Sequence, residues 1–166
     1  MSSFGYRYVV DTNTLGQLGR RRRASEYFKS YAVLTDEVLR EARNLSDLDT
    51  LRKNLYATTS HVLEQLVQVM RTVPIDDKRL VDLYRNKGGA DPLLIACALD
   101  GQYRDSVYLD APEWVVVTAD DAVRRKAEEF GLRTLTNTQF AAIIDSAAPA
   151  DVLDAFENVR AEVEPA

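Results

Sequence analysis

Four acidic residues occupy places in the sequence where a carboxylate can take part in chemistry. Asp11 and Asp120 each stand just after a run of β-forming apolar residues, where a buried strand would end. Glu41 lies at the margin of an apolar helix stripe, and Asp91 directly precedes a helix that is apolar on nearly all sides. Oxygen ligands of this kind suit a hard divalent cation such as Mg²⁺ or Mn²⁺. A single histidine, His61, cannot build a zinc site, so these carboxylates are the candidate ligands.

Each acid also has a simpler explanation when it is viewed alone. Asp11, Asp91 and Asp120 stand where a helix is expected to begin, and Asp is favoured there because its carboxylate accepts backbone N–H groups. Glu41 could be an ordinary exposed helix residue that pairs with a neighbouring arginine. Glu37 lies one turn earlier on the same side of that helix and could assist or replace Glu41. The arrangement of the whole chain decides whether the four acids act together.

The elements that carry these acids alternate between strands and helices. Apolar runs with little alternation predict buried strands at residues 8–10, 31–34, 114–118 and 132–135. Helices are expected at residues 15–29 with interruptions at its glycines, and at 37–44, 46–56, 60–72, 77–86, 93–99, 120–130 and 137–145. A polar connection is expected at 102–113. This alternation predicts an α/β fold, a three-layer α/β/α sandwich with a central parallel sheet.

In such a sheet, ligands bind beyond the carboxyl ends of the strands, near the point where strand order reverses. Asp11 and Asp120 would stand at two strand ends, and Glu41 and Asp91 lie on helices that could frame the same edge. Two ionised carboxylates about 5 Å apart would repel each other by about 3 kcal/mol at an effective dielectric of about 20. Protonation of one carboxylate could relieve this repulsion. At neutral pH a hard divalent cation is the more natural partner, so we expect a Mg²⁺ or Mn²⁺ site.

Length and composition are those of an ordinary globular chain. Its 166 residues are 46% hydrophobic and 28% charged, and the net charge is −5. We expect one domain over residues 1–146, which is long enough to bury a core, and a helical tail of unknown role over 147–166. No apolar stretch approaches membrane-spanning length and no signal sequence is visible, so a cytoplasmic protein without membrane contact is expected. The lone Cys97 lies in an apolar run, where a buried and inert thiol is expected.

The mild negative charge argues against a surface that coats nucleic acid, although local basic clusters remain compatible with a polyanionic ligand. The densest cluster is formed by Arg20, Arg21, Arg22 and Arg23. These arginines could attract phosphate groups beside Asp11, or they could form a solvated helix face. A second basic cluster, residues 124–126, follows Asp120.

The ordered set of motifs resembles the PIN-domain family, and within it the VapC-like toxins of bacterial and archaeal toxin–antitoxin pairs. The resemblance spans roughly residues 8–140 and includes Gly131 before the last strand. Its motifs are Val9-Val10-Asp11-Thr12-Asn13, Val33-Leu34-Thr35 with Val38-Leu39-Arg40-Glu41, Ala90-Asp91-Pro92-Leu93-Leu94-Ile95-Ala96 and Val116-Val117-Thr118-Ala119-Asp120. Each motif alone is only weakly specific for the family, whereas the occurrence of all four in this order is more specific.

This resemblance implies a metal-dependent endoribonuclease that acts on single-stranded RNA with Mg²⁺ or Mn²⁺. The implied acidic site consists of Asp11, Glu41, Asp91 and Asp120, and the motif favours Glu41 over Glu37. Asn13 and Thr118 would support these ligands, and Asp121, next to Asp120, is an alternative fourth ligand. The resemblance further implies a homodimer and a cognate antitoxin protein, as in a type II toxin–antitoxin system.

Two other functional classes are compatible with an acidic edge on a parallel sheet. The first is a PIN-like module with a degenerate site, which would act through protein or RNA contacts alone. The second is a phosphatase or a receiver-type phospho-acceptor. We disfavour this second class because the first strand ends in Asp11-Thr12-Asn13, without a second aspartate two positions on, and because no lysine follows the last strand.

Overall fold

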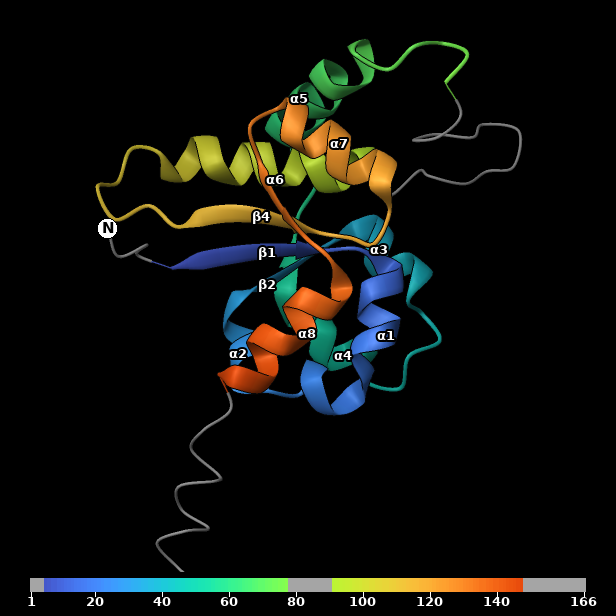
Figure 1. The fold of residues 1–166 in the computed structure, drawn as a ribbon, viewed down its shortest axis with the longest axis vertical. Helices are drawn as coiled ribbons and strands as arrows, with labels where there is room; N and C mark the ends of the chain where they lie inside the picture. Colours follow the sequence, from blue (N-terminus) through green and yellow to red (C-terminus); the bar gives the residue numbers. More distant parts are fainter. Residues whose placement is uncertain (1–4, 78–90, 148–166) are drawn as a thin grey trace, which may run out of the picture.

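The computed structural model describes residues 5–77 and 91–147, and within these ranges the chain folds around one parallel sheet (Figure 1). The strands of this part of the chain are β1 (Tyr6–Val10), β2 (Ala32–Thr35), β3 (Leu55–Tyr56), β4 (Glu113–Val117) and β5 (Arg133–Leu135). Their order across the sheet is β3-β2-β1-β4-β5, and each neighbouring pair is parallel. This confirms the predicted α/β class with a central parallel sheet.

Helices connect the strands and cover both faces of the sheet. In the described residues they are α1 (Thr12–Arg23), α2 (Glu26–Tyr31), α3 (Asp36–Glu41), α4 (Leu48–Leu51), the 3₁₀ helix η1 (Arg52–Asn54), α5 (Ser60–Arg71), α6 (Asp91–Asp105), α7 (Asp121–Glu129) and α8 (Asn137–Ser146). Helices α1, α2 and α8 lie on one face, and α6 and α7 lie on the other, with α5 packed onto α6 (Figure 1). The result is a three-layer α/β/α sandwich.

The carboxyl-terminal parts of the two central strands, residues 8–10 and 114–117, are buried because their side chains are apolar without interruption. Val9, Val10 and residues 115–117 are fully inaccessible to solvent. On the α8 side, the ring of Tyr8 packs against Phe140 with 4.7 Å between ring centroids. Parallel strands covered on both faces read as such continuous apolar runs, which is why their positions could be predicted from the sequence.

The sequence prediction was wrong between residues 46 and 56, where one helix was expected. The chain instead forms α4, η1 and then the short edge strand β3. The side-chain amide of Asn54 turns the chain into this strand by donating to the carbonyl oxygens of Lys29 and Ala32, at 3.0 and 2.8 Å. A two-residue strand carries no readable periodicity, so contacts distant in sequence determine it.

Other boundaries also shift. Of the two glycines expected to interrupt the first helix, only Gly19 has a non-helical backbone, with φ at 73°, and α2 begins as a separate helix. Helix α6 continues to Asp105, into the segment expected to be a polar connection. The helices expected at 77–86 and in the tail at 147–166 fall almost wholly outside the described residues, so the predicted domain boundary stays a prediction. Cys97 is buried, as expected, and burial raises the pKa of its thiol to about 12.

Close packing fixes α6 against the sheet at a glycine. A Cβ added at Gly101 would lie 2.4 Å from ring atoms of Trp114, which is fully packed on β4. We predict that Gly101→Ala lowers the free energy of unfolding by about 1–3 kcal/mol, because overpacking displaces either the helix or the indole ring. Urea unfolding followed by circular dichroism measures the loss.

The matched control for this prediction is Gly16→Ala in α1. A Cβ at Gly16 meets nothing within 4 Å. This substitution should stabilise the protein by up to about 1 kcal/mol, since alanine loses less backbone entropy than glycine in a helix. Equal effects of the two alanines would contradict the tight contact at Gly101.

Two neighbouring arginines of α1 form ion pairs of very different burial. Arg23, only 5% exposed, donates two 2.8 Å hydrogen bonds to Asp47 and a third, at 2.9 Å, to the carbonyl oxygen of Leu15. Arg22 forms the same two-pronged pair with Asp145, but on the open surface. The buried pair ties α1 to the segment that precedes α4.

We predict that Asp47→Asn destabilises the fold by about 3 kcal/mol at neutral pH, because it leaves the Arg23 charge buried without a partner. The hydrogen bonds from Arg23 hold the pKa of Asp47 below its usual value near 3.9. The stability that the ionised carboxylate contributes is therefore complete above about pH 5 and is lost as the pH falls through the lowered pKa. The difference between parent and variant, measured by urea unfolding, should shrink over that acidic range. Asp145→Asn is the exposed counterpart and should have little effect, and a larger loss there would contradict the role of burial.

Candidate active site

The strand order places a topological switch point between β1 and β4. From β1 the chain moves to β2 and β3 on one side, and then crosses over to β4 and β5 on the other. Val10 of β1 is in register with Val117 of β4, and the backbone N–H of Asp11 donates to the carbonyl oxygen of Val117 at 3.1 Å. Asp11 therefore begins the edge at which open parallel sheets bind their ligands.

Asp11 is held by hydrogen bonds to both of its carboxylate oxygens. Oδ1 accepts the backbone N–H of Thr14 at 2.7 Å, which is the N-cap bond of α1. Oδ2 accepts the hydroxyl of Thr118 at 2.6 Å. The carboxyl group is 6% exposed. The capping explanation is thus correct for Oδ1, but it leaves the bond across the strands to Thr118 unexplained.

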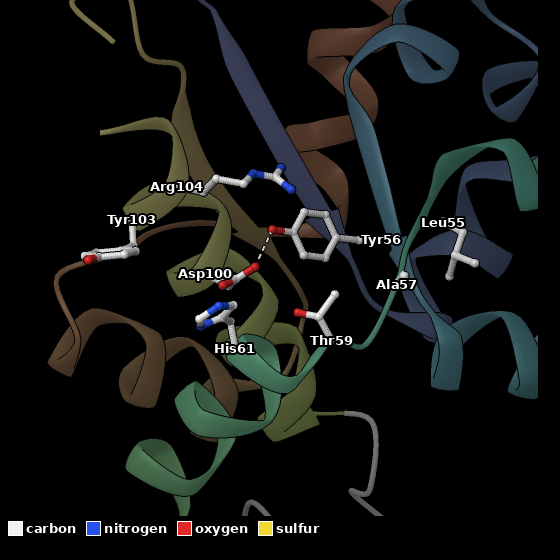
Figure 2. A pocket seen from close by; sticks show the side chains of 8 residues that line it. All are labelled: Leu55, Tyr56, Ala57, Thr59, His61, Asp100, Tyr103 and Arg104. Atoms are coloured by element: carbon white, nitrogen blue, oxygen red, sulfur yellow. Dashed lines mark hydrogen bonds between the residues drawn. The ribbon is translucent and has the colours of Figure 1, made fainter. Parts of the chain in front are cut away.

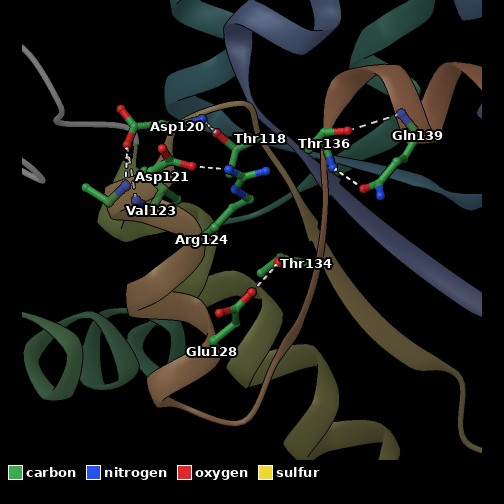
Figure 3. Close-up of polar contacts among 10 residues, drawn as sticks. Thr118, Asp120, Asp121, Val123, Arg124, Glu128, Thr134, Thr136 and Gln139 are labelled. Atoms are coloured by element: carbon green, nitrogen blue, oxygen red, sulfur yellow. Dashed lines mark hydrogen bonds and ion pairs between the residues drawn. The ribbon is translucent and has the colours of Figure 1, made fainter.

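The Thr118 side chain joins the two strand ends. Its hydroxyl donates to Asp11 and accepts the backbone N–H of Asp120 at 3.1 Å. Asp120 caps α7, with Oδ1 accepting the backbone N–H groups of Ala122 at 2.7 Å and Val123 at 3.3 Å (Figure 3). Because its side chain is exposed, Asp120 keeps acceptor capacity toward solvent.

The alternative ligand next to Asp120 has a different environment. Asp121 lies in the first turn of α7, where its carboxylate pairs with the Arg124 guanidinium (Figure 3). A carboxylate whose charge is already offset is a weaker candidate for a cation. The geometry favours Asp120.

The same contrast separates the two glutamates of α3. Glu41 accepts the hydroxyl of Thr12, the residue that follows Asp11, at 2.5 Å, so it lies beside the start of α1. Glu37 instead forms an ion pair with Arg40. Glu41 is therefore the glutamate that shares an edge with Asp11. The contact through Thr12 was not predicted, although its position next to Asp11 was the available clue.

The remaining sequence candidates are placed less fully. Asp91 is the first residue of α6, and its side chain lies outside what the structure describes. Helix α6 ends shortly before β4 begins and packs along it, so the helix start lies toward the carboxyl edge (Figure 1). Asn13 is exposed in the first turn of α1. Its supporting role stays a prediction.

The chemistry of this edge fits a hard cation. Among the described residues, no Lys or Arg forms an ion pair with Asp11, Glu41 or Asp120. All three acids offer oxygen ligands, and their hydrogen-bond partners described above are threonine hydroxyls and backbone N–H groups. Oxygen ligands of this kind suit a hard cation. The side chains within the described part of the chain do not by themselves form a group of three or more metal-binding residues. Complete coordination would need Asp91 or movement of the acids toward an ion.

Some basic residues of α1 form ion pairs with acidic side chains, and others are exposed to solvent. Arg22 and Arg23 form ion pairs with Asp145 and Asp47, and Arg23 is buried, so this part of the arginine cluster is neither a solvated face nor free to meet phosphate. Arg20 and Arg21 are exposed, but they lie in the last turn of α1, at the opposite end of this helix from Asp11.

A closer basic side chain lies on α7. Arg125 is exposed and lines two hollows of about 490 and 370 Å³. Asp120 lines the larger hollow, and Asp121 lines both. Arg125 is therefore placed to meet a phosphate group next to Asp120.

We predict that Thr118→Val destabilises the protein by about 1–3 kcal/mol. The substitution keeps the shape of the side chain but removes the hydroxyl, which leaves the buried Asp11 Oδ2 and the Asp120 N–H without their partner. Denaturant unfolding measures the loss.

Thr14→Val is the matched control for Thr118→Val. Thr14 is as buried as Thr118, but its hydroxyl has no hydrogen-bond partner among the described residues. Its removal should be neutral or mildly stabilising. If both valine variants lose the same stability, the hydroxyl of Thr118 does not link the two strand ends.

Comparison with known proteins assigns no function to this edge. No protein-family model matches the chain, and no curated protein matches it. None of the helices that the structure describes is both long and apolar enough to cross a membrane. The functional conclusion therefore rests on the residues of the edge and their contacts.

Proposed function

We propose that this chain is a metal-dependent endoribonuclease of the PIN type, with its acidic site at the carboxyl edge of β1 and β4. The observation that carries the proposal is the Thr118 hydroxyl, which bonds the Asp11 carboxylate and the Asp120 backbone across the switch point. Helix capping does not need this bond between strands. A site that must hold two acids together does.

The absence of a counter-charge supports the same proposal. Asp11 is almost fully buried, and Glu41 and Asp120 lie close by through Thr12 and Thr118. Carboxylate oxygens without a basic partner among the described residues are free to bind a hard divalent cation. Mg²⁺ or Mn²⁺, held by Asp11, Asp120, Glu41 and Asp91, would activate a water molecule and offset charge on the phosphodiester.

The side chains of the protein have separate roles in this proposal. Thr118 orients the Asp11 carboxylate, and the N-cap bonds of Asp120 fix that side chain at the start of α7. Carboxylates give no attraction for a polyanion, so exposed cations must supply it. Arg125, which is exposed and lines the same hollow as Asp120, is one candidate, and Arg20 and Arg21 would meet more distant phosphates of the same strand.

The wider biological assignment belongs to the same proposal. A PIN-type ribonuclease of this size fits the toxin of a type II toxin–antitoxin pair, with a homodimer and a cognate antitoxin as its partners. The second candidate function is a PIN-like module that binds RNA or protein without cleaving. The capping roles of Asp11 and Asp120 favour it, since they give both acids a structural purpose. Titration calorimetry with Mn²⁺ separates the two functions, because a module without chemistry need not bind metal.

We predict that Asp11→Asn lowers the rate of RNA cleavage at least about a hundredfold, because loss of a ligand charge removes several kcal/mol of transition-state stabilisation. The asparagine oxygen can still cap α1, and its NH₂ group can donate to Thr118, so the fold should persist. Cleavage of a pool of structured RNAs with Mg²⁺, and with EDTA as the blank, measures the rate. An unchanged rate in Asp11→Asn would refute the site.

Paired variants test the choice of ligands in the same assay. Asp120→Asn and Glu41→Gln should abolish most cleavage, whereas Asp121→Asn and Glu37→Gln remove carboxylates that already pair with arginines. The second pair should retain activity close to that of the parent. The reverse ranking would move the site to Glu37 or Asp121.

A further inference from the structure

A separate cavity of about 570 Å³ lies away from the acidic edge. It is formed by β3, the start of α5 and the second half of α6 (Figure 2). Asp11, Glu41 and Asp120 do not line it. Its volume is within the range of pockets that bind small molecules.

A buried carboxylate forms the floor of this cavity. Asp100 is 8% exposed, and its Oδ2 accepts the hydroxyl of Tyr56 at 2.6 Å (Figure 2). Burial and the Asp100 carboxylate raise the pKa of Tyr56 well above its usual value, so the hydroxyl stays protonated and donates. No Lys or Arg in the described ranges forms an ion pair with Asp100. The other oxygen, and a second lone pair on Oδ2, remain as acceptors.

The walls of the cavity suit a flat ring. Tyr103 is 76% exposed and lines the cavity together with His61 and Asp100 (Figure 2). An exposed aromatic ring of this kind is a stacking platform for a nucleobase. The guanidinium of Arg104 lies 5.0 Å from the centre of the Tyr56 ring and lines the cavity. This positive charge disfavours a cationic ligand and favours one that carries a phosphate.

We propose that the cavity binds a guanine base, with Asp100 accepting its N1–H and 2-amino groups and Tyr103 stacking on its ring. A carboxylate is an acceptor only, so it needs two adjacent N–H donors. Guanine has them on its Watson–Crick edge, whereas adenine and cytosine place an acceptor nitrogen next to their amino group. The 2-amino group of guanine and its neighbouring N1–H therefore select this base from adenine and cytosine, and uracil offers only one N–H on that edge.

The guanine can belong to a free nucleotide or to an RNA strand. Asp100 lies nine residues after Asp91, about 13 Å along α6. That separation would let one RNA strand reach both this cavity and the acidic edge. The binding site itself does not rest on the proposed nuclease function, because it uses none of the residues of that edge.

The test is a calorimetric titration of the full chain in EDTA with GMP, IMP and AMP. GMP should bind at least about tenfold more tightly than IMP, which lacks the 2-amino group, and AMP should bind more weakly still. A uridine oligoribonucleotide with one guanosine, compared with the same oligonucleotide without it, separates the two sources of the base. If the guanosine-containing strand binds more tightly than GMP, the ligand of the cavity is RNA. If it binds equally or more weakly, the ligand is a free nucleotide.

Variants separate the two recognition elements. Asp100→Asn should abolish the preference for GMP over AMP. Tyr103→Ala should lower the binding affinity for both nucleotides by about the same factor. Asp110→Asn, in the exposed connection before β4, is the charge-matched control and should bind like the parent. Thermal unfolding establishes whether each variant is folded. If Asp100→Asn does not fold, the nucleotide titrations of the parent and of the Tyr103→Ala variant still test the proposed guanine site.

Equal binding of GMP and AMP to the parent overturns the proposal. So does a folded Asp100→Asn variant that keeps the preference for GMP, or a parent that binds no GMP at millimolar concentration. These measurements involve neither a metal ion nor RNA cleavage, so their outcome is independent of the outcome of the nuclease assays.

Discussion

The pairing of β1 with β4 is the constraint on which the rest of the structure depends. Their register sets Val10 opposite Val117, so the residues that follow each strand emerge side by side. Only then can the hydroxyl of Thr118 reach Asp11. Residues 8–10 of β1 and 114–117 of β4 are buried, which gives this register little freedom to slip. The packing of the hydrophobic core thus determines where the acidic edge lies.

The same pairing places two helix-capping aspartates at one edge of the sheet. Asp11 and Asp120 each cap a helix, so each keeps backbone N–H partners whether or not a ligand is bound. Hydrogen bonds from backbone N–H groups to a carboxylate are short and directional, so they hold each side chain in one orientation. Capping and catalysis are therefore compatible uses of the same side chain. The capping bonds fix the direction of the carboxylate, while the remaining acceptor positions stay available.

The features that could be predicted from the sequence are those that depend on local pattern. The central strands, the helix that starts after Asp120 and the burial of Cys97 all follow from runs of apolar residues and from capping preferences. Features that depend on distant partners could not be predicted. Arg23 looks like its three arginine neighbours in the sequence, and only its contact with Asp47 buries it. Likewise, Asp100 gave no functional signal because Tyr56, which bonds to it, was expected to lie in a helix.

Helix α6 links these observations physically. Its apolar residues 93–98 are buried against the sheet, and Gly101 lets it approach Trp114 more closely than any other residue would. The helix is therefore a rigid spacer, with Asp91 at its first position and the Asp100 cavity in its second half. Any ligand long enough to contact both places would have its register set by the helix rise and not by loop motion. A ribonuclease built in this way would choose its cleavage position by distance from a recognised base, and the packing of α6 would fix that distance.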